Sequence, residues 1–148
     1  MSRVLLHSLV FSPDGVSTAY IMTDLALELK RLGHSVTVLT TTPHYNINQK
    51  ALEGQPMKKH WLGLLYYSEC GGIPVWHVKL PMKGSRVWAR AVDYVRFHIL
   101  SLIAGLYTIG PQDIVIATSP PLTIGVISWL LGLRWHAPSV YKVAEVYP

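Results

Sequence analysis

Apolar and β-branched residues run together in two segments near the N-terminus. Val4–Phe11 is almost continuously apolar and ends at the turn-forming segment Ser12–Gly15, whereas Ser35–Thr41 is rich in β-branched residues. Such runs are typical of parallel strands that are buried on both faces. Between them, apolar residues recur at helical spacing at Met22, Leu25, Leu29 and Leu32. The pattern predicts a strand–helix–strand crossover in which Ser17 or Thr18 caps the helix.

The central part of the chain predicts a loop followed by two strands. Thr42–His60 is polar, contains Pro43, and has no convincing period, so we expect a long loop. Trp61–Glu69 and Pro74–Leu80 lie on either side of two consecutive glycines, Gly71 and Gly72. These two strands fit either a hairpin or a pair of strands within a larger sheet.

The C-terminal part alternates helices and strands. Apolar residues at helical spacing predict a helix over Arg86–Leu106, and Pro120 and Pro121 fit the first turn of a second helix that runs to Leu133. Strands are expected at Asp113–Thr118 and Pro138–Val146. The order predicts an α/β fold with a Rossmann-like, mostly parallel sheet flanked by helices. Because the last strand is followed by no further crossover, we expect residues 1–148 to be one domain of a truncated or split protein.

The composition narrows the classes of partner. Half of the 148 residues are hydrophobic, 14% are charged and the mean hydropathy is +0.29, which predicts surface that something else covers. The formal charge of +5 favours anionic partners. The longest apolar helical run, Phe97–Ile109, is shorter than the roughly 18 residues of a bilayer span, so no transmembrane helix is expected. The single cysteine, Cys70, favours a reducing compartment.

Candidate binding residues follow the predicted strands. In an open parallel sheet, ligands bind beyond the carboxyl ends of the strands, and those ends lead into loops that contain Asp14 with Gly15, then His44, and then Thr118 with Ser119. Gly15 and Ser17 precede a predicted helix whose N-terminal N–H groups favour phosphate or a sugar hydroxyl.

Structural interpretations of the same residues stay open. Asp14 and Gly15 also fit an ordinary strand-to-helix turn, Ser119 also fits a helix cap, and His44 also fits a solvated loop histidine. Glu145 ends the last predicted strand and is the candidate catalytic base, although a carboxylate that pairs with Lys142 fits the pattern as well.

The basic residues and the histidines bear on two further kinds of site. Basic and aromatic residues gather before and within the long helix, which suits the edge of an anionic membrane; the candidate membrane-contact residues are Lys83, Arg86, Trp88 and Arg90. A helix with solvated arginines explains the same pattern. The histidines lack metal-binding spacing and no nucleic-acid-binding motif accompanies the charge, so neither a metal nor a nucleic-acid partner is expected.

Four segments carry a resemblance to a known family. They are FSPDG at Phe11–Gly15, LALELKRLGHSVTVLTT at Leu25–Thr41, TSPPLT at Thr118–Thr123 and EVYP at Glu145–Pro148. Together they resemble family-four retaining glycosyltransferases of the GT-B fold, and within these the bacterial O-antigen and colanic-acid type, which includes fucosamine transferases. The chain departs from that pattern where Asp14-Gly15 stands in place of two glycines, and where Glu145 stands in place of an aspartate.

The resemblance implies a particular division of labour. The N-terminal domain would hold a lipid-linked sugar acceptor, and a C-terminal domain or partner chain would bind the nucleotide sugar. Gly15 would lie near the donor phosphates, Ser119 near the cleft, and Glu145 near the reacting hydroxyl. Transfer would retain configuration and require neither metal nor other cofactor, and the enzyme would sit peripherally on the inner face of the plasma membrane. The chain alone would be inactive.

Two other classes of function remain open. One is a membrane-docking or binding subunit that pairs with a separate catalytic chain of a split transferase. The other is an unrelated Rossmann-like module that binds a small ligand, which would be favoured if the isolated protein bound a nicotinamide or flavin nucleotide. The donor sugar, the acceptor and the linkage do not follow from these residues.

Overall fold

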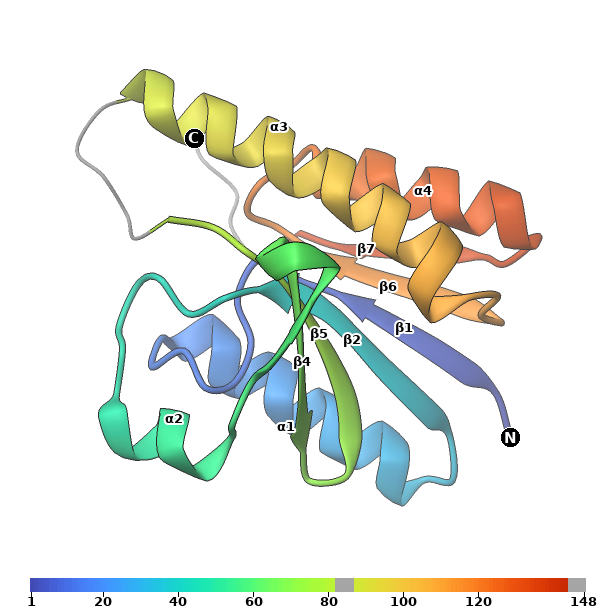
Figure 1. Ribbon diagram of the computed structural model, residues 1–148. Coiled ribbons are helices and arrows are strands. Elements are labelled where there is room, and N and C mark those ends of the chain that lie inside the picture. The colour runs from blue at the N-terminus through green and yellow to red at the C-terminus, as the bar shows by residue number, and fades with distance from the viewer. Residues whose placement is uncertain (82–86, 144–148) are drawn as a thin grey trace.

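The structure of the chain, a computed structural model, contains one seven-stranded sheet between two layers of helices (Figure 1). It describes residues 1–81 and 87–143, with the backbone alone for residues 87–90. The strands are β1 (Arg3–His7), β2 (Ser35–Thr41), β3 (Lys58–His60), β4 (Leu65–Cys70), β5 (Ile73–Val78), β6 (Ile114–Thr118) and β7 (Ser139–Lys142). The α-helices are α1 (Ser17–Arg31), α2 (Gln49–Gly54), α3 (Val87–Ala104) and α4 (Ile124–Trp135).

The sheet has the order β3-β4-β5-β2-β1-β6-β7 and is mostly parallel. β1 pairs in parallel with both β2 and β6, and parallel pairing extends outward to β5 on one side and β7 on the other. β4 runs antiparallel to β3 and β5. The chain therefore reverses its direction of winding beside β1, which creates a topological switch point between β1 and β6. The predicted Rossmann-like fold class is confirmed.

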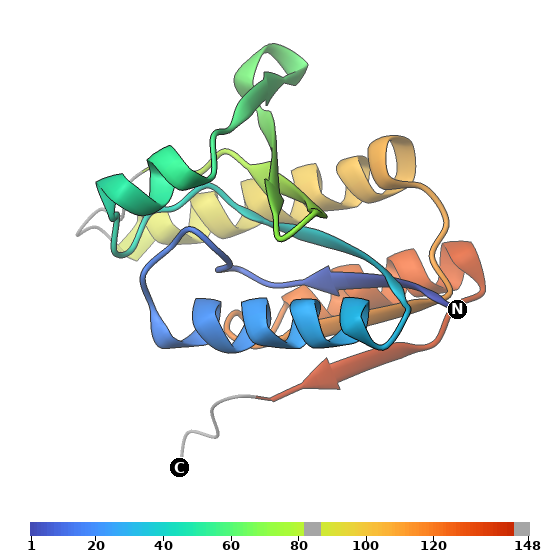
Figure 2. The same ribbon diagram turned by 90° about the horizontal axis from the view of Figure 1, so that it is seen from below.

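The two faces of the sheet carry separate cores. Along β1, Val4 and Leu6 pack toward α1, whereas Leu5 and His7 pack toward α3 and α4. This alternation follows from the two-residue period of a strand. Figures 1 and 2 show α1 on one face of the sheet and α3 with α4 on the other. The central strands are thus buried on both sides, as the continuous apolar run predicts.

The N-terminal strand is shorter than its apolar run. β1 ends at His7, yet Leu9, Val10 and Phe11 in the following loop are buried. Hydrophobicity indicates burial and not hydrogen-bonded strand pairing, so the strand predicted from the apolar run is too long. The capping prediction is also wrong. The N-cap of α1 is Val16, and neither Ser17 nor Thr18 supplies a side-chain cap.

The predicted long loop, residues 42–60, contains regular structure. Its helix α2 begins at Asn48, whose side chain accepts hydrogen bonds from the N–H groups of Lys50 and Ala51. β3 is exposed at every position and lies at the edge of the sheet, so no apolar pattern marks it. β4 and β5 form a hairpin within the larger sheet, so both arrangements that fitted their sequence are present, and φ is positive at both Gly71 and Gly72.

The second half of the chain differs from expectation mainly at its helices. α4 begins at Ile124, so Pro120 and Pro121 belong to the preceding loop and not to the first turn. α3 continues into a π-helical turn at Gly105–Ile109. With that turn, Ala91–Ile109 spans 19 residues at a hydropathy of 1.2, which is long and apolar enough to cross a membrane. Its inner residues Phe97 and Ala104 are fully buried against the sheet, whereas only 22% of the span is buried within this domain.

Candidate functional site

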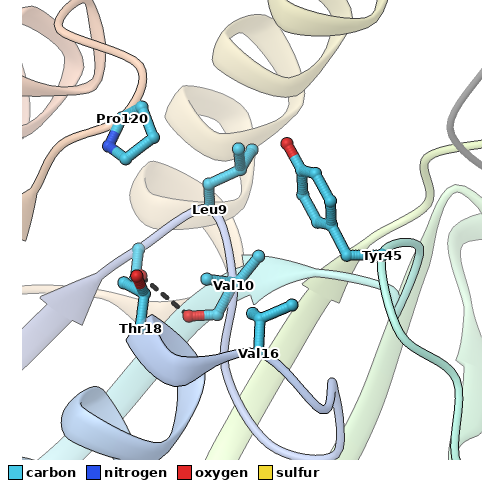
Figure 3. Close-up of a pocket in the computed structure, with 7 residues that line it drawn as sticks. Leu9, Val10, Val16, Thr18, Tyr45 and Pro120 are labelled. Carbon is cyan, nitrogen blue, oxygen red and sulfur yellow. Dashed lines mark hydrogen bonds between the residues drawn. The ribbon is translucent and has the colours of Figure 1, made fainter.

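The candidate site is a pocket at the carboxyl ends of the parallel strands, beside the switch point between β1 and β6. Its volume is about 170 Å³. It is lined by residues from four segments that are far apart in the sequence: Ser8, Leu9, Val10, Val16, Thr18, Tyr45 and Pro120. Figure 3 shows Tyr45 on one side and Pro120 on the other, with Leu9 and Val10 between them. Among the side chains that the structure describes, no charged one lines this pocket.

The N-terminus of α1 supplies the polar wall of the pocket. Thr18 lies in the first turn of α1, where N–H groups have no partner within the helix and the helix dipole is positive. Two further hydroxyls, those of Ser8 and Tyr45, belong to the lining. Ser8 donates to the carbonyl of Val10 at 2.8 Å, which fixes the course of the chain as it leaves β1. An apolar floor with a few hydroxyl and N–H groups suits a sugar ring or another small polar ligand.

A buried carboxylate positions the Tyr45 side of the pocket. Asp14 is buried, and its oxygens accept hydrogen bonds from the backbone N–H groups of His44 at 3.1 Å, Tyr45 at 3.2 Å and Asn46 at 2.9 Å. Bonds from N–H groups to an ionised carboxylate are stronger than those between neutral groups. Asp14 therefore ties the loop after β2 to the loop after β1.

Gly15 also allows the loop after β1 to lie close to the loop after β2. Its N–H donates to the carbonyl of Asn46 at 2.9 Å, and the Asn46 side chain donates back to the carbonyl of Gly15. A Cβ at position 15 would lie 2.9 Å from the Asn46 side-chain nitrogen and 3.0 Å from its carbonyl oxygen. A larger residue would push the two loops apart. The N–H of Gly15 is thus directed at Asn46.

Replacing Asp14 should loosen this clamp measurably. In Asp14→Asn the side chain loses its charge and turns an NH₂ group toward backbone N–H donors, so we expect the free energy of unfolding to fall by about 1–3 kcal/mol. Urea unfolding at neutral pH measures it. Asp24→Asn, which changes an exposed aspartate on α1, is the matched control and should leave the midpoint unchanged. Equal midpoints for the two variants would show that the clamp does not stabilise the fold.

His44 lies behind Tyr45 and is buried. Its Nδ1 is 3.0 Å from the carbonyl of Thr42 and 3.1 Å from the hydroxyl of Thr41, and that hydroxyl itself donates to the carbonyl of Leu9. Nδ1 therefore carries the proton and donates. The rings of His44 and Tyr45 have centroids 4.3 Å apart. These contacts orient His44 within the loop, which excludes a solvated loop histidine.

A second buried hydrogen-bond network, formed by His77, Ser68 and Gln55, holds the loop after β1. His77 Nδ1 donates to the carbonyl of Thr41 at 3.0 Å, and its Nε2 accepts from Ser68 at 2.7 Å. Gln55 donates to Ser68 and to the carbonyl of Ser12, and accepts from the Ser12 hydroxyl. Burial lowers the pKa of His77 to about 4, so the ring is neutral and this pattern of donors is consistent.

The loop after β6 closes the other side of the pocket. Thr118 and Ser119 are both buried, and the N–H of Ser119 donates to the carbonyl of Lys142, which continues the ladder to β7. The N-cap of α4 is Thr123, so neither residue caps that helix, and that interpretation is wrong. Pro120, next in the chain, reaches the pocket.

None of the predicted site residues whose side chains the structure describes lines this pocket itself. Asp14 and Gly15 line a neighbouring pocket of about 220 Å³ between the first loop and α2, and Ser17 is exposed at the start of α1. His44 and Ser119 are held by the contacts described above, and Thr118 is buried at the end of β6. Glu145, Lys83 and Arg86 lie outside the described residues, as do the side chains of Trp88 and Arg90.

The lining residues that the sequence did not single out are mostly apolar. Leu9, Val10 and Val16 read as ordinary core positions, and Pro120 as a helix start. Only their position after the ends of strands, together with the fold, identifies them as pocket residues. Across residues 1–81 and 87–143, no three His, Cys, Asp or Glu side chains gather as a metal site would require.

The comparisons with known proteins rest on structure. No family model and no curated protein matches the sequence. The catalytic domain of starch synthase IV from Arabidopsis thaliana, solved with ADP and acarbose, superimposes with a TM-score of 0.73 at 13% identity. The likeness covers 96% of this chain but 34% of that one, so the chain spans about a third of the starch synthase domain. The fold is that of a GT-B glycosyltransferase domain.

A second similar structure belongs to another class of protein. The C-terminal domain of PF1911 hydrogenase from Pyrococcus furiosus superimposes with a TM-score of 0.57 at 12% identity, covering 95% of this chain and 90% of that one. Both identities are too low to carry more than the fold. The Rossmann-like architecture is thus shared with two proteins whose activities are unrelated.

Proposed function

We propose that this chain is the N-terminal, acceptor-side domain of a glycosyltransferase that moves a sugar from a nucleotide sugar to a lipid-linked or saccharide acceptor. The observation that carries the proposal is the pocket at the switch point, where α1 and the loops after β1, β2 and β6 meet. In an α/β sheet this is where ligands bind. The likeness to a starch synthase catalytic domain supports the reaction class.

The size of the pocket supports a site that two domains complete. A volume of about 170 Å³ is below the roughly 300–1,000 Å³ of complete small-molecule sites. In the proposed enzyme a C-terminal domain or partner chain supplies the opposite wall and binds the nucleotide. We therefore expect no turnover by the 148-residue protein alone with any nucleotide sugar.

The finer assignment rests on the four segments that resemble family-four transferases. On that basis the reaction proceeds with retention and without a metal, and the acceptor is a lipid-linked sugar of bacterial surface polysaccharide synthesis, such as O-antigen or exopolysaccharide. The enzyme works peripherally at the inner face of the plasma membrane. Glu145 follows β7 in the sequence and acts as the base at the acceptor hydroxyl.

Tyr45 provides a test of acceptor binding in the isolated domain. Its ring forms one wall of the pocket, so Tyr45→Ala should weaken binding of farnesyl-diphosphate-linked N-acetylglucosamine about tenfold or more by calorimetry. Tyr20→Ala is the control, because Tyr20 is exposed on α1 and lines only the neighbouring pocket. An affinity unchanged by Tyr45→Ala would show that the acceptor does not bind in this pocket.

The alternative with a specific observation behind it is a Rossmann-like small-ligand module of redox type. The likeness to the hydrogenase domain, which covers nearly all of both chains, favours it. Titration with NADH and with FAD separates the two. Micromolar binding of either nucleotide at the switch-point pocket, without binding of the sugar acceptor, would favour the redox module.

A further inference from the structure

The outer surface of α3 carries an exposed apolar stripe. Phe97, Ser101 and Ala104 on its inner side are buried against the sheet. On its outer side, apolar residues recur every three or four positions and are exposed, at Val92, Val95, Ile99, Ile103 and Tyr107. This spacing aligns them along one side of the helix and its π-helical extension.

The neighbouring helix repeats the arrangement. α4 buries Ile124 and Leu131 and exposes a second stripe at Leu122, Val126, Trp129, Leu130 and Leu133, whose first residue lies just before the helix. α3 and α4 contact each other and cover the same side of the sheet (Figure 1). The two stripes, ten residues in all, form what we call the α3–α4 face. Two adjacent apolar stripes exceed the scattered apolar residues of an ordinary surface.

The charges around the α3–α4 face indicate what covers it. In sequence, α3 and α4 carry Arg90, Arg96 and Arg134 against a single acidic residue, Asp93. The chain as a whole carries a formal charge of +5. An apolar surface with a positive balance complements the anionic headgroups and acyl chains of a membrane.

One end of the α3–α4 face has the residues of a membrane interface. A hollow of about 210 Å³ between the end of α3 and the end of α4 is lined by Leu106, Tyr107, Pro111, Arg134 and Trp135. Tyrosine, tryptophan and arginine are the side chains that settle at the boundary between headgroups and acyl chains. Their position beside the apolar stripes matches that boundary.

We infer that the α3–α4 face docks on an anionic lipid bilayer with both helices lying in the interface. A spanning orientation would require α3 to leave the sheet and strip Phe97 and Ala104 from the core. The docking surface is formed chiefly by apolar residues and therefore extends beyond the basic cluster expected from the sequence. The inference deepens the proposed peripheral location by naming the surface that meets the lipid, and it rests on neither the sugar donor nor the acceptor.

Vesicle co-sedimentation tests the inference with a matched pair of variants. Val95→Ser/Ile99→Ser removes two stripe residues that are 58% and 54% exposed. Tyr20→Ser/Ile21→Ser removes two residues on the opposite face of the sheet that are 62% and 53% exposed. We expect the unmodified protein to bind phosphatidylcholine vesicles containing about a quarter phosphatidylglycerol, the stripe variant to bind at least about tenfold more weakly, and the α1 variant to bind normally.

Several results would overturn the inference. Equal loss in both double variants, or no binding of the unmodified protein to the phosphatidylglycerol-containing vesicles, would do so. So would a dimer in sedimentation equilibrium that Val95→Ser/Ile99→Ser dissociates, since a second copy would then cover the face. Circular dichroism establishes that both variants are folded. Stronger binding to the anionic vesicles, reduced by salt, supports the arginine contribution.

Discussion

Acidification from about pH 7.5 to about pH 5 should lower the free energy of unfolding by about 4 kcal/mol, because two histidines are buried in the neutral form. Burial, reinforced by His98, lowers the pKa of His7 to about 3, and burial lowers that of His77 to about 4. In the unfolded chain both rings take up a proton as the pH falls through about 6.5. The folded state does not, so stability is complete above that pH and declines below it.

The surroundings of His7 explain why it resists protonation. The Ser128 hydroxyl donates to the carbonyl of Ile124, so His7 Nδ1 must donate to Ser128 at 2.8 Å. Nε2 is buried and has no hydrogen-bond partner among the described residues. A proton on Nε2 would add a buried charge without an acceptor.

Urea unfolding at a series of pH values measures this dependence. His7→Leu should remove about half of the slope between pH 7 and pH 5, whereas His60→Gln, which removes an exposed imidazole, should leave the slope unchanged. The slope reports proton uptake and is independent of the absolute stability of each variant. A slope of zero in the unmodified protein would contradict the assignment of both histidines as neutral and buried.

In the proposed two-domain enzyme, Glu145→Gln should reduce kcat by a factor of roughly 10² to 10⁴. The expectation follows from the resemblance, which places a carboxylate near the acceptor hydroxyl, and from the position of Glu145 after β7 in the sequence. Glutamine keeps the shape of the side chain but cannot accept the proton. Acceptor binding should change much less than kcat.

Melting and turnover must be measured on the same preparation of Glu145→Gln. A carboxylate with a structural role would lower the melting temperature and leave the folded fraction active. Near-normal kcat in a well-folded variant would refute the catalytic role. Lys142→Met, which removes the cation that precedes Glu145 in the sequence, tests the alternative in which Glu145 serves only as an ion-pair partner.

The sequence predicts the sheet because its central strands are buried on both faces. Leu5, Leu6, Val38 and Leu39 have no solvent exposure, and such strands stand out as apolar runs. The sequence does not predict β3, for the opposite reason. Lys58–His60 is an exposed edge strand without apolar residues, so no apolar run marks it. α2 depends on a capping asparagine and on tertiary position, neither of which has a periodic signature.

The sequence predicts which loops form the site but not which of their side chains line it. Residues beyond strand ends were expected to meet, and the loops after β1, β2 and β6 do converge on one pocket. Which side chain of each loop faces the pocket depends on local backbone course. Asp14 turns inward because three N–H groups of the next loop converge on its carboxylate. Sequence spacing carries no information about such a long-range contact.

The most direct test of the proposed function is chemical-shift mapping of the 148-residue protein with farnesyl-diphosphate-linked N-acetylglucosamine. Saturable shifts at the amides of Leu9, Thr18 and Tyr45 are expected, because these residues line the pocket at the switch point. Farnesyl diphosphate without the sugar should perturb these amides less. Shifts confined to other parts of the domain, or equal shifts with and without the sugar, would contradict an acceptor site at this pocket.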